Sequence, residues 1–598
     1  LLYYIPAGQY GKEGVLALLE QHPEIKFVSL VGIDLAGNDT DEKIPMSAFF
    51  DDYESFFEGR AVQTDGSSVV LTNIATLNNA RVDMWCDPSV NWFVDYNYEN
   101  IDPVTGLPTG TLRIPAFLMH NYRYVDSRSI LKRSCDYVRA ELLALIKEHG
   151  LPGMPHVKAD EVVDIIFTSA TELEFWVKTP SRTVTKKELS VSQKLQEQYW
   201  QRTHGTVRTA LEQAVERLDR YGMVAEMGHK EVGGVKAKLD EDGHEAVVLE
   251  QLEIDWKFSN NPLQTADNEL QARIIVREVF RENGLDVTFN AKPIIGVAGS
   301  GEHTHFGVMA KLKSGKVVNL FSPEDMRKES ASSLGIGAIM GLLKHYEAIN
   351  PFISSTTDSL NRLKPGFEAP VCIVTSLGTD PSEPSRNRTI LCGLIRDIDN
   401  PMATRYELRS PNPYTNTYTA LALIFISAFD GMKYAITSGK TQAQLEAELS
   451  KEVGETSDYL ATNRAYRTEK DVFDDFTQEE RNQMFGVAPA TVWENIKGYQ
   501  NNPELVETLA QGNAFAKDLM DSFIKRWKLV LANRLIPNNL DTVRSMVAIH
   551  TDSRNSVDDK RFAEVNDLRF YLAKDSDDRK SLFTRLIDAL NDGEYDLA

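Results

Sequence analysis

Three short segments of this 598-residue chain place ionisable side chains at every second position. They are E-L-E at 172–174, H-T-H at 303–305 and R-Y-E-L-R at 405–409. Because alternate residues of a strand lie on one face of a sheet, each segment predicts a strand that presents these side chains together. In the first and third segments the intervening residues are apolar or aromatic. The chain is therefore expected to contain a sheet with one charged face.

The first two segments suit a divalent cation. Glu172 and Glu174 would point the same way, and parallel carboxylates repel each other unless a cation lies between them. Mg²⁺ favours such oxygen ligands. His303 and His305 follow a G-S-G turn, and either imidazole could bind a metal or a phosphate group. The alternative is a solvated strand face or a solvated turn. Taken alone, the E-L-E segment favours a solvated strand face, and the H-T-H segment fits a solvated turn and a binding site equally well.

Two further segments suit anionic substrates. Arg405 and Arg409 flank Glu407, a pattern that fits an anionic substrate beside a metal but also a surface ion-pair ladder. In the loop N-R-L-K-P-G-F-E-A-P, a Pro-Gly turn separates Arg362 from Glu368. Such a loop can carry a mobile acid and an anion clamp, and the alternative is an ordinary charged loop.

Charge and composition exclude several classes of function. The formal net charge is −22, which would repel nucleic acid and anionic membranes. Four scattered cysteines without a C-x-x-C pair argue against a disulfide framework or a zinc ribbon and fit the cytoplasm. No basic leader is seen, and the longest apolar run, near 421–429, is too short to cross a bilayer. A P-loop motif is absent, and Gly335, Gly337 and Gly341 fit helix packing better than nucleotide binding.

The length indicates three to four domain-sized units. Strands and turns are expected from about 25 to 120, with D-G-S-S at 65–68 forming a hairpin turn. Strands and helices then alternate to about 409, and the remainder is expected to be mostly helical, with a charged helical appendix from about 535. The clearest predicted elements are a strand at 165–177 and helices at 129–149, 206–221, 265–283 and 331–348.

Seven motifs, taken in order, resemble those of the glutamine synthetase family. They are D-G-S-S, E-x-E, H-x-E-V, G-S-G-x-H-x-H, N-R-L-x-P-G-x-E-A-P, N-R and R-x-E-x-R-x-P, and the resemblance covers about residues 25–530. It implies an α+β fold, with an N-terminal β-grasp domain at 1–122. A catalytic domain at 123–530, built on an antiparallel half-barrel sheet flanked by helices, would follow. Residues 531–598 would form a helical extension that the resemblance does not cover.

The resemblance also implies roles for individual residues. Two or more Mg²⁺ or Mn²⁺ ions would bind at each site, the first through Glu174, Glu231 and Glu253 and the second through Glu172, His303 and Glu407. Catalytic roles would fall to an ammonium-binding acid, a flap acid and a phosphoryl-stabilising arginine, which are Asp65, Glu368 and Arg388. Glutamate and ammonium would contact Ser68, Tyr199, Gly299, Arg362 and Arg409, whereas ATP would contact His305, Arg396 and Arg405.

The implied reaction joins ammonia to the side-chain carboxylate of L-glutamate through a γ-glutamyl phosphate, giving glutamine, ADP and phosphate. The implied assembly is a cytoplasmic homo-oligomer of stacked rings, a dodecamer or alternatively a decamer, with active sites between neighbouring subunits and no nucleic-acid or membrane partner. Two rivals are a γ-glutamyl-amine ligase for a larger amine and a non-catalytic member. Asp65, Ser68 and Glu231 favour ammonia, and the complete ligand set argues against the non-catalytic alternative.

The chain departs from the family pattern at several positions. Ala298 stands where an asparagine that helps to seat glutamate is usual, and Met402 stands where a lysine is frequent. About fourteen extra residues, at 236–249, separate Glu231 from Glu253, and the interval between Arg388 and Arg396 is also long. Phe473 takes the place of a tyrosine that some bacterial members adenylylate, so we expect this control to be absent.

Overall fold

The computed structural model describes residues 1–9, 11–178, 200–234, 249–294, 297–365, 370–530 and 556–597. Two predicted site residues, Tyr199 and Glu368, lie outside these ranges, as does all of the 236–249 insertion except Leu249. The described chain forms two compact units, Leu1–Leu519 and Met520–Ala598. The domain boundary predicted near residue 122 falls inside the first unit and stays a prediction.

The first unit begins with a sheet in the order β1-β6-β7-β2-β3, in which β5 and β8 also pair with β7 and β4 pairs with β5. Its long central strand, β7, runs parallel to β2 and antiparallel to β5, β6 and β8. Three short helices accompany this sheet. The elements are β1 (Tyr4–Ile5), α1 (Lys12–Glu20), β2 (Ile25–Gly32), β3 (Ile44–Pro45), α2 (Met46–Asp51), α3 (Tyr53–Phe57), β4 (Gln63–Asp65), β5 (Arg81–Cys86), β6 (Trp92–Ile101), β7 (Pro108–His120) and β8 (Arg123–Tyr124).

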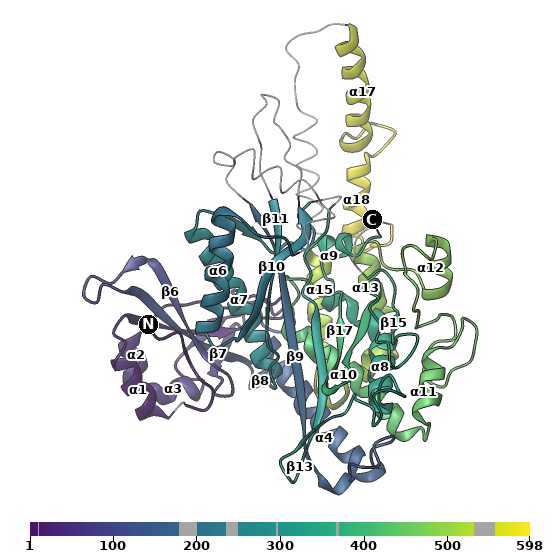
Figure 1. The fold of residues 1–598 in the computed structure, drawn as a ribbon. Coiled ribbons are helices and arrows are strands. Elements are labelled where there is room, and N and C mark those ends of the chain that lie inside the picture. The colour runs from purple at the N-terminus through teal and green to yellow at the C-terminus, as the bar shows by residue number, and fades with distance from the viewer. Residues whose placement is uncertain are drawn as a thin grey trace. The chain divides into compact units, whose positions relative to one another are not determined.

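A second sheet follows in the same unit, in the order β10-β11-β9-β13-β17-β16-β15, with β12 paired to β9 and β14 to β13 (Figure 1). Among its described strands every pairing is antiparallel except that of β15 with β16. This mixture of helices and sheets confirms the predicted α+β class. The strands are β9 (Val162–Lys178), β10 (Ala225–Gly234), β11 (Leu249–Trp256), β12 (Asp286–Thr288), β13 (Thr304–Leu312), β14 (Val317–Asn319), β15 (Thr375–Ser376), β16 (Cys392–Asp397) and β17 (Asn400–Leu408).

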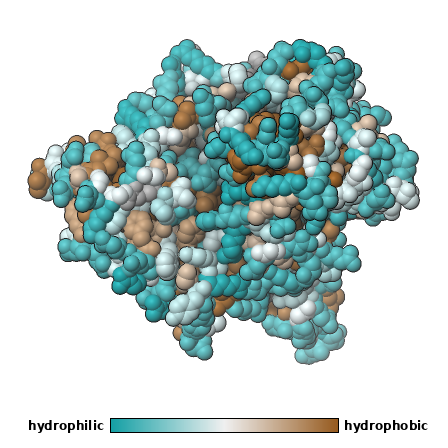
Figure 2. All heavy atoms as spheres, turned by 90° about the horizontal axis from the view of Figure 1, so that it is seen from below, coloured by the Kyte–Doolittle hydropathy of each residue, from teal (hydrophilic) through white to brown (hydrophobic). Residues whose placement is uncertain are grey.

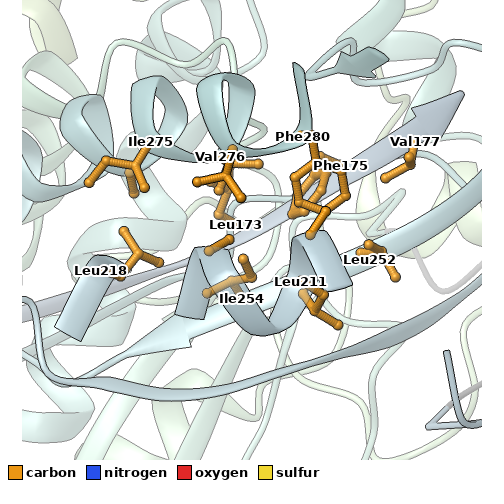
Figure 3. Packing of buried hydrophobic residues seen from close by; sticks show 14 of the residues in the cluster. Leu173, Phe175, Val177, Leu211, Leu218, Leu252, Ile254, Ile275, Val276 and Phe280 are labelled. Carbon is orange, nitrogen blue, oxygen red and sulfur yellow. The ribbon is translucent and has the colours of Figure 1, made fainter. Parts of the chain in front are cut away.

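One face of β9 and β11 is covered by two helices, α6 (Gly205–Arg220) and α7 (Pro262–Glu282). Leu173, Phe175 and Val177 alternate along β9 and are fully buried against these helices (Figure 3). The ring of Phe175 meets that of Phe280 on α7 edge to face, with 5.3 Å between centroids. Because this face is apolar, the alternation turns the intervening glutamates of β9 to the opposite face.

Three long helices pack together beside this sheet: α4 (Ser127–His149), α8 (Ser333–Ile353) and α10 (Thr417–Thr437). α10 is long and apolar enough to cross a membrane by composition alone, but 83% of its apolar window is buried inside the unit. A Cβ at Gly431 would lie 1.8 Å from the Gly337 carbonyl oxygen, and one at Gly341 would lie 2.1 Å from that of Ser427. The predicted packing role of these glycines is therefore confirmed.

The predicted helices form close to their expected limits, with one exception. α8 continues to Ile353, five residues past the predicted end, although Pro351 lies inside it. Its last turn stays helical because Asn350, Phe352 and Ile353 are buried and hold the backbone in place. The remaining elements of the first unit are η1 (Ala159–Glu161), α9 (Thr357–Arg362), α11 (Gln442–Leu449), α12 (Gln478–Phe485), α13 (Val492–Gln500), α14 (Pro503–Leu509) and η3 (Gln511–Asn513).

A buried arginine links the N-terminal sheet to the helices. The side chain of Arg128, at the start of α4, is fully buried and donates to Asp87, which follows β5, at 2.6 Å, and to Asp267 on α7. The hydroxyl of Tyr418 on α10 also donates to Asp267, at 2.6 Å. Because an unpaired buried charge is costly, this cluster fixes the N-terminal sheet against α4, α7 and α10.

The second unit, described by itself, consists in its described residues of helices and short irregular segments. It contains most of α15 (Lys517–Val530), together with α17 (Ser556–Ala573) and α18 (Leu582–Asn591). Ser581 caps α18 by accepting from the Thr584 amide, and Phe583 and Ala589 are its buried residues.

The face of the protein in Figure 2 is mostly hydrophilic, with a few hydrophobic patches, as the charged composition implies.

Candidate functional site

The polar face of the second sheet gathers acids from neighbouring strands. Glu174 on β9 is the register partner of Glu253 on β11, and Glu172 is the partner of Asp255. Like charges placed directly opposite each other on adjacent strands are destabilising. Two such pairs lie side by side here on a largely buried face. This part of the sheet therefore fits a positively charged ligand.

Glu172 is the centre of the hydrogen bonds at this site. Its Oε2 lies 2.8 Å from Nδ1 of His303, and its Oε1 lies 2.8 Å from Nε2 of His305. His303 also lies 3.4 Å from Oε1 of Glu407, the register partner of His305 across β13 and β17. Burial raises the pKa of Glu172, but the hydrogen bonds from both imidazoles outweigh it and hold the pKa well below its usual value.

The pKa of Glu253 is shifted in the opposite direction. Burial, and then the nearby carboxylates of Glu174 and Glu172, raise the pKa of Glu253 well above its usual value. Burial and Glu172 also raise the pKa of Asp255 to about 7. His229 Nε2 lies 3.2 Å from Glu253 and 3.8 Å from Asp255. This side of the site therefore brings together more carboxyl groups than His229 can pair.

Three groups of possible metal ligands result, each with ligand atoms within 4.8 Å of one another. They are Glu172, Glu253 and His303; Glu172, His305 and Glu407; and His229, Glu231 and Glu253. Five of the six predicted ligands fall in these groups. The exception is Glu174, whose Oε2 accepts from the Gly301 amide and from Gln251 Nε2, both at 2.8 Å. Carboxylates and imidazoles at these separations fit Mg²⁺ or Mn²⁺.

A cavity of about 520 Å³ surrounds these groups. Besides the ligand groups, its lining includes Arg388, Arg409 and two residues with large exposed surfaces, Trp200 and Met227. Arg409 Nη1 donates to Glu407 at 2.8 Å, and Arg405 Nε donates to His305 Nδ1 at 3.1 Å. Since the second contact needs His305 to accept through Nδ1, Arg405 selects the tautomer whose Nε2–H faces Glu172.

Two arginines that the sequence predicts to bind substrates donate to backbone carbonyls in this structure, and their substrate roles stay predictions. Arg362, at the end of α9, is buried and donates to the carbonyls of Arg409, Ser410 and Pro411 at 3.1–3.2 Å. Burial, and then the charge of Arg409, lower the pKa of Arg362 to about 10. Arg396 donates to the carbonyls of Met326 and Glu329. Neither side chain lines the 520 Å³ cavity.

The glycine-rich turn before His303 packs directly on Arg362. A Cβ at Gly299 would lie 2.2 Å from the Ala291 carbonyl oxygen and 2.9 Å from Arg362 Cγ. A Cβ at Gly301 would lie 2.4 Å from Arg362 Nη2. Only glycine permits this approach, so Gly299 shapes the backbone around Arg362, and it does not line the cavity.

The D-G-S-S turn lies on the N-terminal sheet, and neither Asp65 nor Ser68 lines the cavity. Asp65 is exposed and accepts hydrogen bonds from the amide, at 2.7 Å, and the hydroxyl of Ser67. These hydrogen bonds lower the pKa of Asp65. Within a single chain, the proposed proton acceptor is therefore separate from the metal-binding groups.

Sequence reasoning missed several residues of this cavity. His229 and Asp255 are the most important, followed by Trp200, Met227 and Arg386. The H-x-E-V motif contained His229, and its position two residues before Glu231 placed it on the same strand face. Asp255 has the same relation to Glu253, so both could have been found from the alternation. Of the departures noted in the sequence, Met402 is half exposed, and Phe473 lines a neighbouring cavity of about 970 Å³, which shares Arg386 and Arg388 with the metal-binding cavity.

The sequence of this chain is similar to those of known proteins. A family model described as "Glutamine synthetase, catalytic domain" matches residues 156–463. A glutamine synthetase from Vibrio cholerae is 28% identical over 494 residues, covering 77% of this chain and 92% of the relative. One from Pyrococcus abyssi is 35% identical over 221 residues, covering 37% and 42%.

Solved structures show the same fold. A Plasmodium falciparum glutamine synthetase aligns with a TM-score of 0.60 at 15% identity, covering 93% of this chain and 100% of the other. A GmaS–ADP complex aligns with a TM-score of 0.58 at 16% identity, covering 92% and 99%. At such identities the likeness concerns the fold alone.

Proposed function

The chain belongs to the glutamine synthetase family of ATP-dependent ligases, and we propose that it joins ammonia to the side-chain carboxylate of L-glutamate. The γ-phosphoryl group of ATP first passes to that carboxylate, giving ADP and γ-glutamyl phosphate. Ammonia then attacks the carbonyl carbon, its C–O bond to phosphate breaks, and glutamine and phosphate leave. The observation that carries this proposal is the set of opposed carboxylates, imidazoles and arginines around one cavity.

Two or more Mg²⁺ or Mn²⁺ ions would be held by the three ligand groups. The fit rests on the crowding of carboxyl groups, because burial and the neighbouring carboxylates raise the pKa of Glu253 and a bound cation would relieve both effects. When bound, such ions would neutralise phosphate oxygens and the developing charge. His229 is a ligand candidate in addition to the six predicted residues. Glu174 would orient Gly301 and Gln251 through its hydrogen bonds, and it would bind a metal only if its side chain turned toward the cavity.

The arginines would bind the anionic groups. Arg388 lines the cavity and would stabilise the transferring phosphoryl group, and Arg409 would bind glutamate while fixing Glu407. Arg405 and His305 would face ATP. Arg362 would contribute by setting the backbone that follows Arg409, because its guanidinium already binds the carbonyls of residues 409–411.

Ammonium must lose a proton before it can attack, and Asp65 is the proposed acceptor, with Ser68 beside it. Because both are exposed on the N-terminal sheet, the proposal includes a second copy of the chain whose turn completes the cavity. A homo-oligomer of stacked rings, a dodecamer or a decamer, provides such neighbours. We propose a cytoplasmic location, which the four buried free cysteines support.

The test measures phosphate release from ATP with Mg²⁺ and glutamate, with ammonium or methylamine as the nucleophile, together with glutamine formation. We expect release to depend on ammonium, and Glu172→Gln to reduce it by at least about 100-fold, because this carboxylate belongs to two ligand groups. Lys12→Gln, on α1 far along the chain from the site, is the matched surface control. No release with either nucleophile would contradict an active ligase.

A second candidate is ligation of a larger primary amine to glutamate. The observation that favours it is the apolar edge of the cavity, where Trp200 is 61% and Met227 40% exposed close to Glu231. An alkyl group would gain by covering this surface. Turnover with methylamine or ethylamine but not with ammonium would establish this alternative in place of the first.

A further inference from the structure

Arg386 and Arg388 reach the metal-binding cavity from a long loop, residues 377–391, which connects β15 to β16. All of this loop is described, and it forms no helix and no multi-residue strand. A loop of this length without secondary structure of its own is uncommon in a compact protein. An arginine on such a loop can meet a transferring phosphoryl group accurately only if the backbone beneath it is held in place. The contacts that hold the loop are therefore candidates for a role in the reaction.

One carboxylate receives several hydrogen bonds from the beginning of this loop. Glu469 accepts from the amide of Leu377 at 3.1 Å and from that of Gly378 at 3.0 Å. It also accepts from the hydroxyl of Ser376, which is hydrogen-bonded in addition to the hydroxyl of Ser385. Burial raises the pKa of Glu469, but its hydrogen bonds outweigh this effect and lower the pKa below its usual value. The first turn of the loop is thus bound to an ionised side chain that is only 23% exposed.

Arg467 completes this contact. Its Nε donates to Glu469 at 2.8 Å, and its Nη2 donates to the carbonyl of Gly378 at 2.9 Å. Its Nη1 donates to Glu446 on α11 at 3.0 Å, so the ion pair is anchored on a helix. Gly378 has a φ of +96°, and a Cβ there would lie 2.5 Å from the carbonyl oxygen of Glu383. The chain therefore folds back tightly at Gly378, and one ion pair holds both its amide and its carbonyl.

The residues that follow Glu469 hold the part of the loop that carries the arginines. The side-chain amide of Asn387 donates to the carbonyl of Lys470 at 2.9 Å. The hydroxyl of Thr389 accepts from the amide of Val472, also at 2.9 Å. Arg388 lies between these two contacts in the chain. The backbone on both sides of Arg388 is therefore tied to the segment that contains Glu469.

We propose that Glu469 is a positioning residue for phosphoryl transfer, which acts by holding the loop that presents Arg388 to the metal-binding cavity. This role rests on the proposed function, in which Arg388 stabilises the transferring phosphoryl group, whereas the hold on the loop does not. Without the carboxylate, two backbone amides and the guanidinium of Arg467 would lose their acceptor together, and the first turn of the loop would loosen. Glu469 does not line the metal-binding cavity, so its effect on the reaction passes through the loop.

The kinetic test compares Glu469→Gln with the wild type in the ligation assay. We expect kcat to fall by about 10–100-fold, because small displacements of a reacting group have effects of this size. The KM values for ATP and glutamate should change by less than about threefold, since Arg388 is proposed to act in the transition state. Glu383→Gln is the matched control, because it makes the same change at an exposed residue of this loop that also lines the 970 Å³ cavity. An unchanged kcat in Glu469→Gln, or an equal fall in Glu383→Gln, would overturn the proposal.

A double-mutant comparison separates positioning of Arg388 from a general loss of structure. Residues that act as a unit have non-additive effects on turnover. In the background of Arg388→Gln, Glu469→Gln should therefore lower kcat by less than about twofold, well below its effect in the wild type. The same loss in both backgrounds would show that Glu469 acts independently of Arg388 and would refute the positioning role.

The hold on the loop is measured by amide hydrogen exchange and mass spectrometry of the full chain, in the absence of ATP, glutamate and metal. Peptides from residues 377–391 should exchange at least about tenfold faster in Glu469→Gln than in the wild type, and at the wild-type rate in Glu383→Gln. Unchanged exchange in Glu469→Gln would overturn the proposal. A wild type without turnover would refute the proposed function, and the exchange rates would still decide whether Glu469 holds the loop.

A second variant serves if Glu469→Gln does not fold. Ser376→Ala leaves the carboxylate in place and removes one of the hydroxyls that donate to it. The loss of one hydrogen bond should raise the exchange rate of residues 377–391 by about fivefold and lower kcat by a similar factor. Exchange and turnover at wild-type rates in Ser376→Ala would then count against the proposal.

Discussion

Replacing Asp255 by asparagine should stabilise the metal-free protein at pH 8 and have little effect at pH 4. Burial and Glu172 raise the pKa of Asp255 from 3.8 to about 7 in the folded chain. A raised pKa means that the folded state holds this proton more tightly than the unfolded state does. The stabilisation is therefore complete below about pH 4 and is lost as the pH rises through 7. Asparagine cannot ionise, so it avoids this loss.

The size of the effect follows from the shift. Three pH units correspond to about 4 kcal/mol, at about 1.4 kcal/mol per unit. Because Asp255 interacts with the charge of Glu172 and is 18% exposed, we expect Asp255→Asn to raise the free energy of unfolding at pH 8 by about 2–4 kcal/mol. If the 519-residue first unit unfolds as one, the midpoint of thermal unfolding should rise by roughly 2–4 °C.

The assay is thermal unfolding followed by circular dichroism in EDTA, from pH 4 to pH 8. The difference between Asp255→Asn and wild type should grow with pH and level off near pH 8. Asp399→Asn, at an 82% exposed position, is the matched control and should show no such trend. A difference that is absent, or that is the same at pH 5 and pH 8, would refute the account of this acid cluster.

Three further variants test other parts of the structure. Mg²⁺ or Mn²⁺ should raise the unfolding midpoint of the wild type and not that of Glu172→Gln; an equal rise in both would exclude Glu172 as a ligand. Gly431→Val should lower the free energy of unfolding, measured with urea, by at least about 3 kcal/mol, since its Cβ would lie 1.8 Å from a carbonyl oxygen. Gly14→Ala, in open space, should not lower it measurably. Arg128→Met should cost about 3–5 kcal/mol by leaving two buried aspartates unpaired, and a neutral result would show that neither is charged in the folded state.

The alternation of residues in the strands was the most reliable guide to the fold and the site. It placed Glu172 and Glu174 on one face of β9 and Leu173 on the other, as the structure confirms. The pattern also holds for His229 and Asp255, each of which lies two residues from a predicted metal ligand. Alternation within a strand is a local property, so one sequence is enough to find it.

Contacts between distant segments could not be predicted in the same way. Nothing near Arg362 in the sequence indicates that its guanidinium would bind the carbonyls of residues 409–411, or that Arg396 would turn to Met326. The exposed position of Asp65 likewise depends on how the N-terminal sheet packs. An arginine in a motif can bind a substrate or a carbonyl with the same donors, and only tertiary structure distinguishes the two.

The two-sided strand β9 also limits how this chain can change during evolution. Inserting or deleting one residue within it would exchange the faces, placing Glu172 in the hydrophobic core and Leu173 among the carboxyl groups of the proposed metal site. Such a change would remove folding and catalysis in one step, so new chemistry can arise there only by substitution. Additional length is tolerated where strands end. The extra residues predicted at 236–249 lie at such a junction in the chain, since β10 ends at Gly234 and β11 begins at Leu249.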